Sequence, residues 1–245
     1  MTRIHILLLM IVIALLAGCA QTVPAQRAKY TLSDFEKPGA ERPLEVYDPI
    51  ASVNKGLYRF NYNFDRFLFL PVVNTYEFIM PNYVEKRVSN FLDNIGEFSN
   101  FTNAALQFKP KSAGITLSRF VINSTVGIAG LWDPASHWKL QRQDEDFGQT
   151  LGRYGTGVGP YIVLPILGPS NLRDTVGLVG DTAAFSAVDP LNFEHNEGWE
   201  YPYLGLDAVD TRHRQPFRYY KSGSPFEYEL VKVLYTEKRK LQIVK

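Results

Sequence analysis

The segment from Ala113 to Trp132 restricts the possible folds of this chain more than any other part of the sequence. It runs 20 residues with Arg119 as its only charged side chain, which approaches the length of a bilayer-spanning helix. Asn123-Ser124-Thr125 interrupts it in the middle, and Gly127 and Gly130 weaken its second half as a helix. Two structures accommodate these features. One is a re-entrant or broken hairpin buried against protein or a watery cavity, and the other is a central core helix that ends in a glycine turn.

A lone cation inside such an apolar segment is costly unless it is paired. A lipid phosphate is one possible partner for Arg119, and a protein carboxylate or a backbone carbonyl is the other. The sequence leaves both partners open.

The N-terminus carries a targeting signal. Arg3 precedes the apolar run Ile4–Ala17, which is 14 residues long, interrupted only by His5, and too short to remain as a spanning helix. The run ends in Leu16-Ala17-Gly18-Cys19, which resembles the lipobox of bacterial lipoproteins at all four positions. The resemblance implies that Cys19 becomes the first residue of the mature protein and carries covalent diacylglycerol and acyl groups. The alternative is an ordinary signal peptide with Cys19 as a bystander.

These features predict three parts of the chain: a lipoprotein signal peptide over 1–18, a lipidated N-terminus and flexible tether over 19–46, and one folded domain over 47–245. The residue after the cysteine is Ala20. Lipoproteins retained in the inner membrane tend to carry Asp there, so the resemblance implies delivery to the outer membrane.

Composition excludes several classes of protein. With 45% hydrophobic and 13% aromatic residues the chain is too apolar to be disordered. Its 26 basic and 25 acidic residues nearly cancel, which provides no bulk positive field for nucleic acid. One cysteine permits neither an intramolecular disulfide framework nor a cysteine-based zinc site.

Periodicity predicts helices in three places. An apolar stripe at steps of three and four runs from Phe91 to Phe108, and the same spacing recurs from Leu172 to Ala183. Ser224-Pro225-Phe226-Glu227 reads as a capping box with proline at the first helical position, ahead of a helix that reaches Leu241. The stretch 58–70 is ambiguous, because it alternates like a strand up to Asp65 and then becomes apolar on both faces, as a helix would.

Signatures of catalysis are missing from the sequence. The glycine-dense stretch 147–161, which we expect to be irregular, runs into Pro160 without the Gly-Lys-Ser/Thr ending of a phosphate loop. There is no Gly-x-Ser-x-Gly elbow and no His-Glu-x-x-His pair. The acidic runs Asp144-Glu145-Asp146 and Glu194-His195-Asn196-Glu197 are typical of solvated loops. We therefore predict no catalytic residue, no metal site and no enzyme activity.

Taken together, these residues resemble the MlaA family, also called VacJ. The most specific part of the match lies between Phe147 and Asp174, and two weaker blocks agree with it in order and spacing. The matching residues are Phe147-Gly148-Gln149-Thr150-Leu151-Gly152-Arg153-Tyr154-Gly155, Gly157-Val158-Gly159-Pro160-Tyr161, Leu164-Pro165, Leu172-Arg173-Asp174, Asp48-Pro49 with Asn54, Phe60 and Asn61, and Arg119-Phe120 with Asn123, Gly127 and Gly130.

The resemblance implies a mostly α, single-domain, ring-shaped helical protein embedded in the outer membrane, with a central amphipathic channel and a lipid anchor on the periplasmic side. Such proteins have no chemical step. They remove phospholipids from the outer leaflet and pass them to a periplasmic lipid-carrier protein (MlaC-like), and they associate with a trimeric outer-membrane porin. A porin-associated structural lipoprotein without direct lipid transfer is the alternative, and a lipid hydrolase in the same membrane is a third possibility.

The resemblance also assigns candidate residues. Arg119 and Asn123 are candidates for the channel or for headgroup contact, and Gly127 and Gly130 match glycines of a mobile hairpin. Val53 and Asn54 are gating candidates, although Val53 stands where the family usually has Phe. The basic residues Lys238-Arg239-Lys240 and Lys245 read either as a contact for an anionic carrier or headgroup or as a solvated helix end.

Overall fold

The computed structural model describes residues 45–192 and 197–244, without the side chain of Glu197. Val46–Lys245 forms one compact unit. The predicted signal peptide, Cys19, nearly all of the tether, Glu194-His195-Asn196 of the second acidic run, and Lys245 lie outside the described residues.

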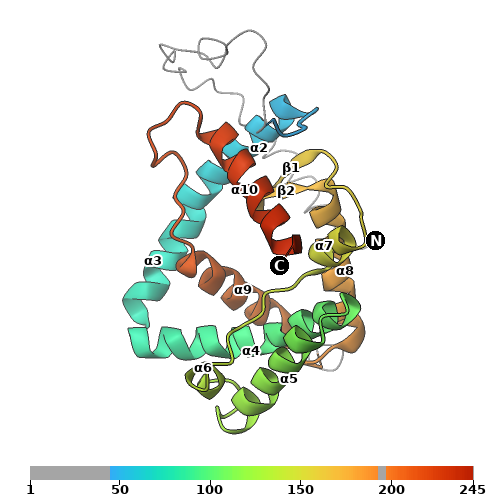
Figure 1. The fold of residues 1–245 in the computed structure, drawn as a ribbon. Helices are drawn as coiled ribbons and strands as arrows, with labels where there is room; N and C mark the ends of the chain where they lie inside the picture. Colours follow the sequence, from blue (N-terminus) through green and yellow to red (C-terminus); the bar gives the residue numbers. More distant parts are fainter. Residues whose placement is uncertain (1–44, 193–196, 245) are drawn as a thin grey trace. The chain divides into compact units, whose positions relative to one another are not determined.

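Helices dominate the described chain, so the predicted mostly α class is confirmed (Figure 1). The helices are α2 (Ala51–Phe64), the π-helix η2 (Asp65–Phe69), α3 (Leu70–Ile79), α4 (Asn82–Leu106), α5 (Pro110–Thr125), α6 (Pro134–His137), α7 (Phe147–Arg153), α8 (Leu172–Val188), α9 (Glu197–Arg214) and α10 (Glu227–Val244). Two short strands, β1 (Tyr161–Leu164) and β2 (Gly168–Asn171), pair antiparallel, with Tyr161 opposite Asn171.

The ambiguous stretch 58–70 is helical, so the alternation that favoured a strand was misleading. Asn54, Tyr58 and Asn61 are buried on one face of α2, which is the spacing of a helix. Pro71 follows and has no N–H, and its ring clashes with a regular helical carbonyl. The chain accommodates it with the π-turn of η2, in which the Leu70 N–H donates to the Asp65 carbonyl five residues back.

The predicted stripe from Phe91 belongs to α4, which forms an antiparallel hairpin with α5. Glu97 pairs with Arg119 and Asn94 with Ser124, so residue numbers rise on one helix as they fall on the other. The predicted stripe extends too far, because α4 ends at Leu106 and Phe108 has a positive φ of 53°. Lys109-Pro110 then begins α5, as the proline at its first position indicates.

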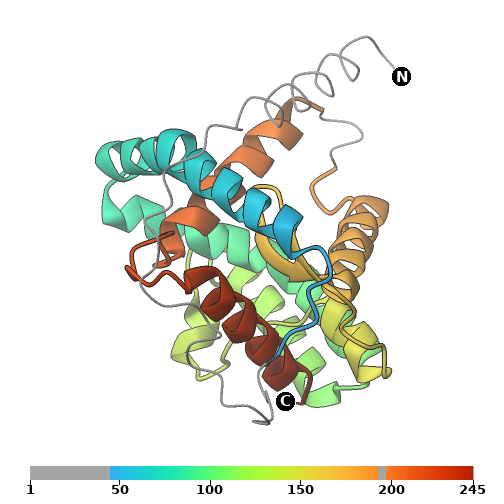
Figure 2. The same ribbon diagram turned by 90° about the horizontal axis from the view of Figure 1, so that it is seen from above.

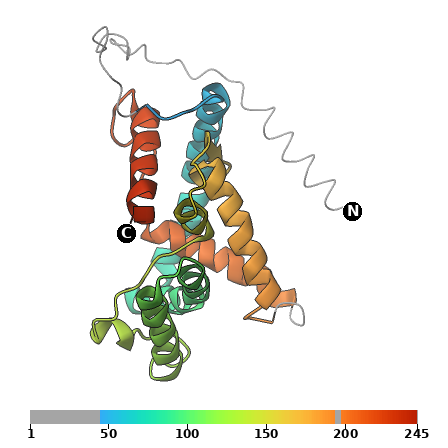
Figure 3. The ribbon, with the colours of Figure 1, turned by 45° about the vertical axis from the view of Figure 1, so that its right-hand side comes forward.

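The glycine-dense stretch is more regular than the sequence predicted. Its first seven residues form α7, whose N-terminus is capped when the Asp146 side chain accepts from the Gln149 N–H at 2.8 Å. Glycine is needed where α7 meets α8, because a Cβ on Gly177 would meet the backbone of Gly148. The two helices therefore pack backbone against backbone (Figure 3).

Helix α10 lies beside α2 (Figure 2), with a cluster of aromatic side chains between these helices and β1. Tyr58, Tyr161 and Tyr228 form its buried centre, and their rings meet edge to face. The predicted capping box is wrong in detail. The Ser224 hydroxyl accepts from the Phe226 N–H at 3.2 Å, but the Glu227 carboxylate turns toward the Tyr220 and Ser222 N–H groups and the Tyr58 hydroxyl.

Candidate functional site

Helix α5 is polar on the face turned toward the protein and apolar on the face turned away. Thr116, Arg119 and Asn123 are buried, at the three- and four-residue spacing that places them on one side of the helix. The other side exposes large apolar residues, namely Leu117, Phe120 and Val121. This is the reverse of a helix in a soluble protein, whose apolar stripe faces the core.

Arg119 is only 3% exposed, and its guanidinium is held by four groups of the protein. Nε donates to Glu97 Oε1 at 2.6 Å, and Nη1 donates to the Leu140 carbonyl at 2.6 Å and to Ser136 Oγ at 3.0 Å. Nη2 donates to Asp133 Oδ2 at 3.3 Å. The pair with Glu97 is deeply buried and joins α5 to α4.

Asn123 extends this network to the start of α6. Its amide donates to Asp133 Oδ1 at 2.9 Å and its carbonyl accepts from the Ala135 N–H at 3.1 Å. Burial raises the pKa of Asp133, but hydrogen bonds from Ser136 and Asn123 and the charge of Arg119 outweigh it, so the pKa lies below its usual value. Of the two partners that the sequence allowed for Arg119, the described structure shows protein carboxylates and a carbonyl; a headgroup contact stays a prediction.

The turn after α5 contains three consecutive residues in the left-handed region. Ile128, Ala129 and Gly130 have φ values of 51°, 55° and 88°. For a β-branched residue such as Ile128 this conformation is unusual, and such strain persists only where surrounding contacts enforce it. Here the turn folds back on α5, because the Ala129 and Gly130 N–H groups donate to the Ser124 and Asn123 carbonyls at 2.9 and 2.8 Å.

Gly127 and Gly130 are both sites of close approach. A Cβ on Gly127 would collide with the backbone of Asn123 and Trp132, and one on Gly130 would lie 2.7 Å from the Asn94 Cβ. Their proposed role as hinges is a question of motion and stays a prediction. The structure gives them a packing role, because they allow the turn to contact α5 and α4.

We expect Gly130→Ala to lower the free energy of unfolding more than Gly155→Ala. Both glycines have nearly the same φ, 88° and 85°, so each alanine incurs the left-handed penalty of about 1–2 kcal/mol. A Cβ at Gly155 meets nothing within 4 Å, whereas one at Gly130 collides with Asn94. Chemical denaturation of both variants measures the difference. Equal losses would show that the turn yields without cost and that contact with α4 does not constrain it.

Asn54 attaches α2 to β1. It is fully buried; its amide donates to Asp48 Oδ1 at 2.8 Å and to the Tyr161 carbonyl at 2.9 Å, and its carbonyl accepts from the Val163 N–H at 2.9 Å. Asn61, two turns further along α2, bonds in the same way to the Leu164 carbonyl. Val53 is 57% exposed and takes no part in this clamp. The two gating candidates therefore occupy opposite environments.

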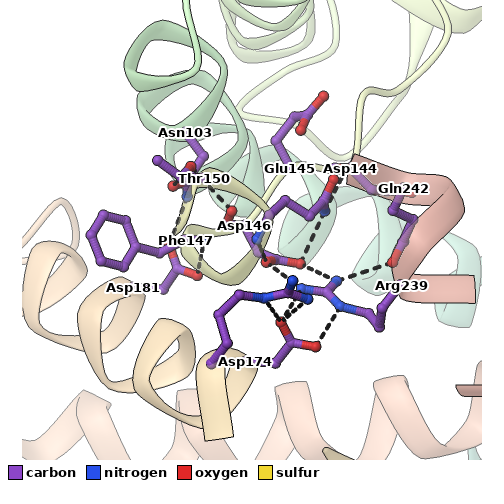
Figure 4. A network of polar contacts seen from close by, with 12 residues as sticks. Asn103, Asp144, Glu145, Asp146, Phe147, Thr150, Asp174, Asp181, Arg239 and Gln242 are labelled. Atoms are coloured by element: carbon purple, nitrogen blue, oxygen red, sulfur yellow. Dashed lines mark hydrogen bonds and ion pairs between the residues drawn. The ribbon is translucent and has the colours of Figure 1, made fainter. Parts of the chain in front are cut away.

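A second buried ionic cluster joins α10 to α7 and α8 (Figure 4). Arg239 donates from Nη1 and Nη2 to Asp146, both at 2.7 Å, and from Nε and Nη2 to Asp174 at 2.8 and 3.1 Å. Arg173 and Tyr235 also donate to Asp174, at 2.8 Å each. The nearby Asn103–Thr150 and Phe147–Asp181 bonds connect the same region to α4 and α8.

The structure corrects two predictions. In the run Asp144-Glu145-Asp146 only Asp144 is exposed: Asp146 pairs with Arg239, and Glu145, which is buried, accepts from Lys109 Nζ at 2.9 Å. Arg239 is not part of a solvated helix end. Glu145 and Arg239 look like surface charges in the sequence, but each is buried and paired with a charged side chain on a distant segment. Sequence reasoning missed Glu97 as well, since no local pattern marked it.

The described residues contain no group of three or more side chains that fits a metal ion. No helix within 45–192 and 197–244 is long and apolar enough to cross a membrane. The distribution of exposed side chains is nevertheless unusual: many large apolar residues lie on the surface, while the interior is rich in Asn, Asp, Glu and Arg. Large exposed apolar areas mark contacts with membranes or other proteins.

Comparison with known proteins agrees with this reading. The family described as MlaA lipoprotein matches residues 46–242. The Intermembrane phospholipid transport system lipoprotein MlaA of Haemophilus influenzae is 33% identical over 171 residues, covering 69% of this chain and 67% of that protein. The protein of the same name from Escherichia coli is 36% identical over 138 residues, covering 55% of each chain.

An uncharacterized protein of Rickettsia prowazekii is 34% identical over 170 residues, which cover 69% of this chain and 66% of that protein, just under two thirds of its length. A solved structure from work entitled "Structural basis for maintenance of bacterial outer membrane lipid asymmetry" superposes with a TM-score of 0.65 at 29% identity, covering 80% of this chain and 98% of that one.

The fold and the site define a helical protein whose interior is rich in polar side chains and whose surface exposes many large apolar residues. The chain belongs to the MlaA lipoprotein family.

Proposed function

We propose that this protein is an outer-membrane lipoprotein that removes mislocalised phospholipids from the outer leaflet and hands them to a periplasmic lipid carrier. The observation that carries the proposal is the arrangement of α5 and the turn that follows it. Arg119 and Asn123 point into the protein, and apolar side chains point outward. A surface of this kind is stable in hydrocarbon, where only the polar groups need protein partners. The names of relatives in a phospholipid transport system support the same reading.

Movement of a lipid in this scheme breaks no covalent bond. The headgroup needs a polar path while the tails remain in hydrocarbon, and a ring with a central amphipathic channel provides both. Covalent acyl groups on Cys19 would anchor the protein at the periplasmic side, since several chains together give stable attachment where one does not. A trimeric porin is the proposed partner within the membrane.

The proposal includes a gating role for the start of α2. The buried amide of Asn54 fixes α2 to β1, and the exposed Val53 precedes it. Loss of these two residues would rotate the preceding chain by about 200° relative to α2, because each helical residue turns about 100°. The deletion would also remove the Asn54 side chain and with it the hydrogen bonds that fix α2 to β1. In this proposal those bonds hold the channel in its resting state.

The test is the amount of phosphatidylethanolamine in the outer leaflet, measured with a membrane-impermeant amine label. Cells lacking this gene should show a rise that a wild-type copy reverses and a Cys19→Ala copy does not, because the variant lacks its anchor.

If the label does not rise although the protein is located in the outer membrane, the transport role is wrong and a structural role beside a porin replaces it. Lyso-lipid found by mass spectrometry would instead indicate a hydrolase. Purified protein mixed with the carrier, with transfer out of a bilayer as the readout, separates direct transport from an indirect effect.

A further inference from the structure

An apolar groove lies between α3 and α9. Figure 1 shows these two helices, and no residue that lines the groove belongs to α4 or α5. Its volume is about 610 Å³. One wall is formed by η2 and α3, from Phe67 to Met80, and the other by Pro202, Gly205, Leu206 and Val209 of α9. The space beside Gly205 is open, because a Cβ there would meet nothing within 4 Å.

The dimensions of the groove suit one acyl chain. Its long wall from Phe67 to Ile79 extends about 18 Å along the helix axis, at the usual rise of about 1.5 Å per residue. One leaflet of a bilayer has a hydrocarbon depth of about 15 Å, half of the full core. A lipid tail therefore matches the groove in both length and polarity.

A cation stands at the Phe67 end of this groove. The Arg66 guanidinium lies 5.2 Å from the centre of the Phe67 ring, and its Nη1 donates to the Tyr62 hydroxyl at 2.6 Å. Arg66 is exposed, and no carboxylate in the part of the chain that the structure describes forms an ion pair with it.

The neighbouring aspartate does not neutralise Arg66. Asp65 is buried, and its two oxygens accept from Nε and Nη2 of Arg212 on α9, at 2.6 and 2.8 Å. The π-turn of η2 thus directs Asp65 inward to α9 and leaves Arg66 and Phe67 outward. Such π-turns are frequent at functional sites.

We infer that this groove binds a diacyl phospholipid, with one acyl chain between α3 and α9 and the phosphate on Arg66. The inference rests on the proposed function and adds to it a site outside the α5 hairpin. A guanidinium next to an apolar groove matches a phosphate joined to a tail, because it supplies charge-assisted hydrogen bonds where the hydrocarbon ends.

The test uses the full-length lipoprotein in detergent and palmitoyl-oleoyl phosphatidylglycerol, whose only charge is its phosphate. Native mass spectrometry measures the affinity for the first bound lipid. The leucine side chain of Gly205→Leu would displace about two methylenes of the acyl chain from the groove, so lipid binding should weaken about tenfold. Arg66→Gln removes the phosphate contact and should also weaken binding about tenfold.

Two variants serve as matched controls. Gly198 is another glycine of α9 with open space around it, so Gly198→Leu makes the same change outside the groove. Lys86→Gln removes an exposed positive charge from α4. Both controls should bind lipid as the wild type does. Circular dichroism establishes that every variant is folded.

Diacylglycerol, which lacks phosphate, separates the two halves of the site: its binding should depend on Gly205 and be indifferent to Arg66. Unchanged phosphatidylglycerol binding in Gly205→Leu and Arg66→Gln would overturn the inference, as would equal losses in the controls. Gly205→Leu that keeps its lipid but no longer co-purifies with a porin would show that the groove contacts the porin, which also overturns it. Failure of the carrier assay with wild-type protein would instead refute the proposed function, because this binding assay contains no carrier.

Discussion

Replacing Arg119 with methionine is expected to lower the free energy of unfolding by about 3–5 kcal/mol. The change leaves Glu97, whose side chain is 1% exposed, as a buried carboxylate without the guanidinium that compensates it. It also removes the donors that hold the Leu140 carbonyl and Ser136. Chemical denaturation of the full-length protein in detergent, followed by circular dichroism, measures the loss.

Two further variants identify the cause. Arg119→Met combined with Glu97→Leu removes both charges and should recover much of the lost stability, because the penalty comes from the unpaired ion. Lys55→Met breaks an exposed pair with Glu229 and should cost less than about 1 kcal/mol. If Arg119→Met were as mild as Lys55→Met, the network at α5 would not hold the hairpin together.

Replacing Arg239 with methionine should cost about 3 kcal/mol at pH 7, because two aspartates on separate elements lose their common partner. Burial raises the pKa of Asp146 and of Asp174, but hydrogen bonds and the charge of Arg239 outweigh it and hold both pKa values below the usual range. Folded carboxyls with lowered pKa values contribute stability that is fully present above their unfolded pKa of about 4.

This stability is lost as the pH falls below about 4 and through the lower pKa values of the folded protein. The wild type and Arg239→Met should therefore differ most at neutral pH and converge in acid. Unfolding curves between pH 7 and pH 3 measure this convergence. Lys240→Met, which removes an exposed charge one residue away, is the control and should follow the wild type throughout. A constant difference across this range would assign the effect of Arg239 to packing instead of charge.

Both expected effects follow from the same feature of the molecule. The hairpin of α4 and α5 and the docking of α10 on α7 and α8 each depend on a buried arginine with two acidic partners. Because the outward faces are apolar, hydrophobic burial alone does not specify how these helices meet. Buried ion pairs give each contact one defined register.

Local patterns in the sequence identified much of the secondary structure. The stripe from Leu172 belongs to α8, and the proline of Lys109-Pro110 begins α5. These elements depend on neighbours three or four residues away, which the sequence displays directly. The family motifs likewise led to Asn54 and Asp174, both of which the structure places in buried polar contacts.

The sequence by itself therefore determined the helical class, the family and the residues whose polarity conflicts with their surroundings. Only the tertiary structure decided which polar groups pair. Glu97 lies 22 positions from Arg119, and Arg239 lies 93 positions from Asp146. The partner of a buried charge depends on how helices dock, and docking is a property of the whole chain. For the same reason the structure, and not local periodicity, made residues 58–65 a helix, because the burial of Tyr58 and Asn61 against β1 and α10 favours that spacing.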